Sequence, residues 1–301
     1  MLIVSLPSVK GATICDLYLP LFMKRIGKIK VVLVVSLAIF FVATGCYEPS
    51  EYTAFDEGEQ VVVIEGLVTD VDSVSAVYVT RTVSSKDTAD CEHINNAVVF
   101  LRDDKGNSAE LENVGDGTYL TDGIVGEVGG RYLLTVEVDG ERYSAIDAMP
   151  TRISVDSVVV EYQNSYTYFD TIGYYVSIYS KQNSDTLQYY RVEVELNGEV
   201  LNGYSELWLF EDAHLADVCK MTIPRNFSQG DSVVMGIYSL SASAYEYYSG
   251  LSKQFVSNFS NIQPPLTNPE NNIRRALGYF QASSVVRIGF VVSSSNHMVL
   301  K

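Results

Sequence analysis

The chain has 301 residues and a formal net charge of −16 at pH 7. Five of its 21 basic residues and one of its 37 acidic residues precede Cys46, so the part from Cys46 onward carries 36 acids against 16 bases. This balance argues against nucleic acid as a partner, because a protein neutralises phosphates with lysine and arginine. It also argues against direct binding to an anionic membrane surface and is typical of a well-solvated protein.

The N-terminal part contains a predicted export signal. Residues 23–30 form a short, positively charged segment, residues 31–42 are apolar apart from Ser36, and the small residues 43–45 lead directly to Cys46. This order is typical of a signal peptide, and the cysteine at the cleavage point makes it a lipoprotein signal. A permanent membrane-spanning helix needs about 20 apolar residues, so the apolar stretch is short for one.

We therefore predict a signal peptide over residues 23–45 and a lipid anchor on Cys46, whose acyl chains hold the mature protein on a lipid bilayer. Residues 1–22 contain no second basic segment and are interpreted as a start codon placed too early. Residues 46–60 hold five acids and no apolar periodicity, which predicts a flexible acidic tether. The tether loosely resembles the surface-export signal of Bacteroidota lipoproteins, and a plain solvated linker is the other interpretation.

Short strands separated by turn residues begin at Val61. The strand over residues 132–138 ends at Asp139-Gly140, and a second β run follows directly. Two β runs joined by Asp-Gly predict a hairpin. Strands and turns at this spacing indicate a β-sandwich of the immunoglobulin-like kind, which we place over residues 61–150.

Residues 151–301 are predicted to form a second β-rich domain that carries one helix. Near residues 240–258, apolar side chains recur every three or four residues, at Leu240, Ala244, Tyr248, Leu251 and Phe255. Ser241 or Ser243 could supply the N-cap of this helix. The remaining segments read as strands, the last of them over residues 285–292, so the predicted fold class is mainly β.

Cys91 and Cys219 are the cysteines that follow the predicted anchor. An exported compartment permits a disulfide between them, but they lie in different halves of the chain, and two separate thiols is the default interpretation. The neighbouring histidines, His93 and His214, form no close ligand pair of the kind that zinc sites use. No metal and no cofactor are therefore expected.

No catalytic motif is recognisable in the chain. Its three histidines stand in no known arrangement, and the G-x-S-x-G, HExxH and P-loop patterns are missing. The many acids cannot single out a glycosidase pair, so we assign no catalytic residues and do not expect an enzyme. The 21 tyrosines suit either an aromatic binding face or the packing of strands and a helix, and packing is favoured.

An aspartate followed by serine or threonine and then an aliphatic residue or alanine occurs six times. Composition alone would produce roughly one or two such triplets. The pattern resembles the O-glycosylation sequence of exported Bacteroidota proteins, with the acceptors Ser73, Thr88, Ser157, Thr171, Thr186 and Ser232. Such residues also form turns before strands, and both interpretations can hold because a strand entrance is exposed.

Several short motifs together resemble the DUF4249 family, a domain of unknown function in Bacteroidota outer-membrane lipoproteins. They lie at residues 64–70, 94–99, 117–119, 130–134, 271–273 and 276–280. The most telling is the C-terminal pair, where Arg274-Arg275 stands in a place that more often holds glycine in the family. Residues 97–143 also resemble the carboxypeptidase-regulatory-like sandwich of outer-membrane uptake systems.

The resemblance implies a location more than an activity. Members are outer-membrane lipoproteins, often associated with TonB-dependent transporters, and no catalytic residues are assigned to them. We therefore expect a non-catalytic accessory or ligand-handling lipoprotein of the outer membrane, with a TonB-dependent β-barrel transporter as its partner. A fimbrial or adhesin-type structural lipoprotein, with residues 285–292 as a donated strand, is the alternative, and a surface hydrolase is a third.

Overall fold

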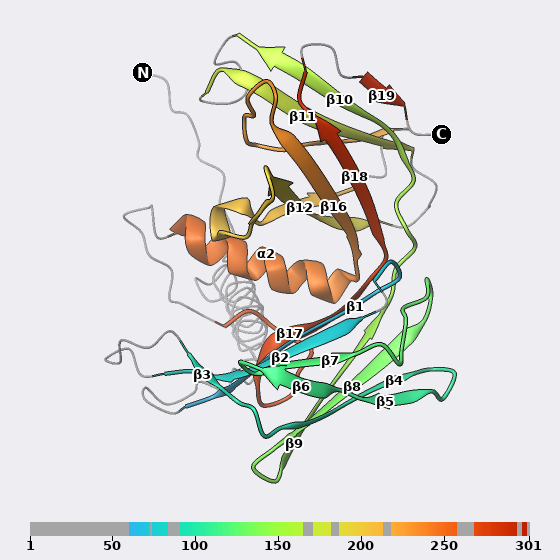
Figure 1. Cartoon of the computed structure of the whole chain (residues 1–301), viewed down its shortest axis with the longest axis vertical. Coiled ribbons are helices and arrows are strands. Elements are labelled where there is room, and N and C mark those ends of the chain that lie inside the picture. Colours follow the sequence, from blue (N-terminus) through green and yellow to red (C-terminus); the bar gives the residue numbers. More distant parts are fainter. Residues whose placement is uncertain are drawn as a thin grey trace, which may run out of the picture. The chain divides into compact units, whose positions relative to one another are not determined.

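Strands make up most of the chain that the structure, a computed structural model, describes (Figure 1). The described residues are 60–72, 74–83, 91–164, 171–181, 187–212, 218–257, 268–293 and 297–299, and all belong to one unit, Phe55–Lys301. The predicted signal peptide and Cys46 lie outside them. The predicted fold class, mainly β with one α-helix, is confirmed. Within the described residues, no helix is long and apolar enough to cross a membrane.

Two sheets form the first sandwich. One has the strand order β17-β1-β2-β7-β6, with β3 beside β2, and the other has the order β5-β4-β8-β9. The strands are β1 (Val62–Thr69), β2 (Ser75–Arg81), β3 (Glu92–His93), β4 (Val98–Asp103), β5 (Ser108–Glu110), β6 (Glu112–Gly115), β7 (Thr118–Thr121), β8 (Arg131–Val138), β9 (Glu141–Ala148) and β17 (Leu277–Ser283).

The first core lies between the inward faces of these two sheets. Alternate residues of β1, such as Ile64 and Val68, face alternate residues of β4 and β8, such as Leu101 and Leu134. This is the period-2 pattern that the sequence displays, because successive strand side chains point to opposite faces of a sheet. The predicted hairpin at Asp139-Gly140 is confirmed, since β8 and β9 pair in antiparallel register across that turn.

Strand β17 was not expected from the sequence. It comes from the C-terminal segment, yet it pairs with β1 in parallel register and closes the first sheet, and its Phe280 is fully buried in the first core. Its burial is continuous rather than alternating, which hides a strand from a periodicity analysis. The first sandwich therefore draws a strand from residues that we placed in the second domain.

The turn before β17 explains the C-terminal motif. Asn272 exchanges two hydrogen bonds with the backbone of Phe280, its Nδ2 donating at 2.7 Å and its Oδ1 accepting at 3.0 Å. Arg275 has a φ of +67°, in the left-handed region that favours glycine. The turn thus forms in this chain with arginine at the position where glycine would be less strained.

Two further sheets form the second sandwich. Their orders are β15-β11-β10-β19 and β13-β12-β16-β18, with β14 also beside β12. The elements are β10 (Val155–Gln163), β11 (Gly173–Lys181), β12 (Tyr189–Leu196), β13 (Glu199–Leu201), the 3-10 turn η1 (Tyr204–Glu206), β14 (Trp208–Glu211), β15 (Val218–Thr222), β16 (Ser232–Leu240), β18 (Val285–Val291) and β19 (His297–Val299). Ile178, Val192 and Met235 are among the side chains buried between them.

Helix α2 (Ala242–Ser257) packs between the two sandwiches, against β12, β14 and β16 on one side and β17 on the other (Figure 1). Its predicted position is confirmed. The N-cap is Ser241, whose hydroxyl oxygen accepts a hydrogen bond from the backbone N–H of Ala244 at 3.2 Å. The buried side of the helix presents Ala244 and Tyr247 to a cluster that also contains Tyr238 and Tyr279.

Candidate functional site

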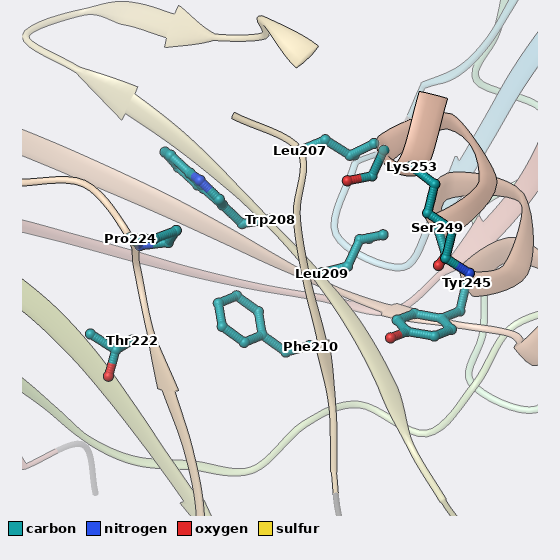
Figure 2. A pocket seen from close by; sticks show the side chains of 10 residues that line it. Leu207, Trp208, Leu209, Phe210, Thr222, Pro224, Tyr245, Ser249 and Lys253 are labelled. Carbon is teal, nitrogen blue, oxygen red and sulfur yellow. The ribbon is translucent and has the colours of Figure 1, made fainter. Parts of the chain in front are cut away.

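A groove of about 380 Å³ lies between α2 and the short strand β14 (Figure 2). Its size falls in the range of small-ligand sites. The residues that line it are Leu207, Trp208, Leu209, Phe210, Thr222, Pro224, Tyr245, Ser249, Ser252 and Lys253. The lining is mostly apolar and aromatic, with a few hydroxyl groups and one ammonium group.

The groove runs along the edge of β14 rather than over one of its faces. Figure 2 shows Leu209 on the side of Tyr245, and Trp208 and Phe210 on the side of Pro224. Because successive side chains of a strand point to opposite faces, a cavity that touches four consecutive residues has to straddle the strand edge. The groove therefore meets both the side chains and the main chain of β14.

The hydrogen-bond register shows which main-chain groups face the groove. The N–H of Asp212 donates to the carbonyl of Gln188 on the β12 side, at 2.9 Å. Main-chain groups of an antiparallel pair alternate between pointing toward the partner and pointing away. The pairing of β14 with β12 continues this register, so Leu209 and Glu211 direct their N–H and C=O groups away from β12.

The helix side of the groove contains one aromatic ring, that of Tyr245, and one charged group, that of Lys253. The ring of Tyr245 stacks on that of Tyr189 with centroids 4.4 Å apart. Burial raises the pKa of Tyr245, and the nearby carboxylate of Glu211 raises it further, so this phenol stays neutral. Lys253 lies further along α2 and is exposed.

The opposite side of the groove belongs to the second core. Trp208 is 6% exposed, and its ring packs among the buried residues of that sandwich. Arg225 and Glu206 form an ion pair of 3.5 Å beside Leu207. The Nε atom of Arg225 is buried and has no hydrogen-bond partner in the described part of the chain. The rigid core thus supports this wall, and an arginine–glutamate ion pair lies at its Leu207 end.

Comparison with known families identifies the chain. The model of the domain of unknown function DUF4249 matches residues 48–288. The chain belongs to the DUF4249 family. Among solved structures, the FN1–FN3 domains of chicken CNTN1 are similar, with 9% identity, a TM-score of 0.24 and a match that covers 62% of each chain. The comparison with curated proteins returned no match.

The three predicted O-glycosylation acceptors of this DUF4249 protein that the structure describes do not line the groove. Ser157 lies within β10 and is half-buried between β11 and β19, whereas Thr171 precedes β11 and Ser232 begins β16, and both are exposed. The hydroxyl of Thr171 is hydrogen bonded to that of Tyr175 at 2.7 Å. The other three acceptors, Ser73, Thr88 and Thr186, lie outside the described residues, as does Cys46.

Cys91 and Cys219 are both free and partly exposed. Cys91 precedes β3 in the first sandwich and Cys219 lies on β15 in the second, so the disulfide that an exported compartment would permit is not formed. Burial raises the pKa of the Cys219 thiol to about 11, with a further contribution from Asp212. Within the described residues, no group of His, Cys, Asp and Glu side chains is arranged to hold a metal ion.

The tyrosines of α2 have two roles: some pack against other side chains, and one lines the groove. Tyr247, Tyr248 and Tyr279 contact one another where α2 meets β17. Tyr245 alone of the helix tyrosines lines the groove. Sequence reasoning placed a strand near β14 but missed the groove, although the unbroken apolar run from Leu207 to Phe210 is a signal that both faces of this strand are covered.

Proposed function

We propose that this DUF4249 protein is a non-catalytic, lipid-anchored protein of the outer membrane that handles a ligand for a TonB-dependent transporter. A signal peptide over residues 23–45 is removed, and acyl chains such as palmitate on Cys46 hold the protein on the membrane. The observation that carries the proposal is the groove, where a strand edge that is unpaired within the described residues and an apolar, aromatic wall are suited to binding rather than to chemistry.

The surroundings of the groove support a binding role. Its aromatic side chains are held by packing before any ligand arrives, since Trp208 is part of the second core and Tyr245 stacks on Tyr189. A preformed wall lowers the entropy that binding must overcome. The family membership supports the location, because it agrees with the lipoprotein resemblance drawn from the sequence.

The fimbrial alternative needs an end strand that can leave its sheet. The candidate, β18, pairs with β16 over seven residues, and the N–H of Val285 at its start donates to the carboxylate of Asp70 in the first sandwich. Release of β18 from its sheet would break both its pairing with β16 and the hydrogen bond to Asp70. This anchoring favours the ligand-handling role.

The test is purification of the protein at its natural abundance from membranes extracted with mild detergent. We expect an outer-membrane β-barrel transporter to copurify with the wild type. The variant Cys46→Ala, which cannot be lipidated, should leave the membrane fraction and lose the partner. A wild-type protein that is anchored but purifies alone would contradict the transporter role.

A further inference from the structure

The edge of β14 is open, whereas a comparable edge in the same molecule is covered. On the outer edge of β17, the N–H of Phe280 donates to Asn272 and the N–H of Ala282 donates to Asp147, at 3.0 and 2.9 Å. Side chains thus satisfy that edge and prevent pairing. In the described part of the chain, β14 pairs with β12 alone, and its outward main-chain groups belong to Leu209, which lines the groove, and to Glu211, two residues further along the same edge.

Outward main-chain groups select a particular kind of ligand. Two residues apart, Leu209 and Glu211 each present one donor and one acceptor along a straight edge. This spacing matches the main chain of another extended polypeptide, as in other cases of strand addition. An apolar small molecule would leave these groups unmatched, and the hydroxyls of a sugar do not repeat at the spacing of a strand.

The walls of the groove fit the side chains of an added strand. Its side chains would point alternately to the two faces of the sheet. On one face they would meet Leu209 and Tyr245, and on the other Phe210 and Pro224. Both walls are apolar, so both sets of side chains would be buried by the same addition.

The charges at the two ends give the added strand a direction. Glu211 lies at the C-terminal end of β14, and Lys253 lies near Leu207 at the other end (Figure 2). Arg225 lies close to this second end too, where it is paired with Glu206, so Lys253 carries the charge that is open to a ligand there. A strand antiparallel to β14 begins beside Glu211 and finishes beside Lys253, so a basic residue at its start and an acidic one at its end would be complementary.

We propose that the β14 edge binds an extended segment of a partner protein, which adds to the sheet as an antiparallel strand with a basic N-terminal and an acidic C-terminal flank. The inference rests on the proposed binding role of the groove and names the chemical class of its partner. Affinity comes from main-chain hydrogen bonds to Leu209 and Glu211, and direction comes from Glu211 and Lys253.

The first experiment uses the full-length lipoprotein in mild detergent and a short, end-capped peptide. The peptide alternates valine and threonine and carries lysine at its start and glutamate at its end. Binding should protect the amides of Leu209 and Glu211 from hydrogen exchange. A peptide N-methylated at the positions that face them should bind at least about tenfold more weakly, because each methyl removes a main-chain donor. Equal binding of the two peptides, or unchanged exchange at both amides, would overturn the proposal.

Variants of Glu211 separate the main chain from the side chain. Glu211→Pro removes an outward N–H but no hydrogen bond to β12, whereas Glu211→Gln keeps the N–H and removes the charge. We expect Glu211→Pro to weaken binding about tenfold and Glu211→Gln about threefold or less. Equal losses would overturn the main-chain role. If Glu211→Pro disturbs the amide protection of β12, the N-methylated peptide decides the question.

Charge reversal tests the direction of the added strand. The peptide with glutamate at its start and lysine at its end should bind several-fold more weakly to the wild type, and the double variant Glu211→Lys with Lys253→Glu should prefer it. No change in preference would overturn the assigned direction.

Two further outcomes identify other occupants. A dimer that forms without peptide and is abolished by Glu211→Pro would show that a second copy fills the edge, and would overturn the proposal. Loss of peptide binding together with continued copurification of a transporter would overturn this inference and leave the proposed function intact. Peptide binding without copurification of a transporter would support this inference and contradict the transporter role in the proposed function.

Discussion

Asp70 and Val285 are 215 residues apart in the sequence, and the carboxylate of the first accepts a hydrogen bond from the backbone N–H of the second at 2.8 Å. The other carboxylate oxygen of Asp70 accepts from Nε of Arg152 at 3.0 Å. Arg152 lies where the chain first leaves the first sandwich, and Val285 lies where β17 passes into β18. One buried carboxylate therefore ties together the two places where the chain passes from the first sandwich to the second.

Asp70→Ala should lower the free energy of unfolding by about 2–3 kcal/mol, because it leaves the N–H of Val285 without an acceptor and Arg152 without its ion-pair partner. The matched control is Asp72→Ala, since Asp72 forms an exposed pair with Arg287 and should contribute about 1 kcal/mol or less. Chemical denaturation measures both. Equal effects would contradict the junction role of Asp70.

Gly278→Ala should destabilise the protein by at least about 3 kcal/mol. The φ of Gly278 is +90°, and a Cβ there would overlap the backbone carbonyl of Ile64 in the adjacent strand. Gly140→Ala is the control, because its φ of +81° is similar but nothing lies within 4 Å of its Cβ. The control should cost about 1 kcal/mol of backbone strain alone. A similar loss in both variants would show that close packing of β17 on β1 is unimportant.

Arg275→Gly should raise the free energy of unfolding by about 0.5–1 kcal/mol, since it relieves a left-handed residue and gives up only an exposed ion pair with Glu141. Arg274→Gly, at a neighbouring exposed position without a positive φ, should instead lower it by about 0.5–1 kcal/mol. Thermal denaturation of the two variants provides the comparison. A loss of stability in both would refute the explanation of the turn.

The Cys219 thiol should titrate near pH 11, against an ordinary value of 9.0. The ¹³Cβ NMR chemical shift of Cys219 against pH in a Cys91→Ser variant measures this, and unfolding should restore the ordinary value. Because the folded-state pKa is the higher one, the contribution of Cys219 to stability is fully present below pH 9.0 and is lost as the pH rises through about 11. Titration near pH 9 in the folded protein would contradict the burial of this group.

The alternating strands and the helix could be predicted because their patterns are local. Turn residues such as Asp139-Gly140 predicted the β8–β9 hairpin, and the spacing of apolar side chains from Leu240 to Tyr248 predicted α2. Strand β17 could not be predicted, since it is covered on both faces and its partner lies more than two hundred residues away. The groove was missed for a related reason: whether the edge of β14 is paired depends on the whole sheet.

The most direct test of the account is site-specific photo-crosslinking of the lipidated protein in its native outer membrane. A photoreactive residue replaces Ser249 in the groove or, as a control, the exposed Ser144 on β9. We predict an adduct with one partner protein from position 249 and none from position 144. The absence of an adduct from the groove, or the same adduct from both positions, would contradict the account.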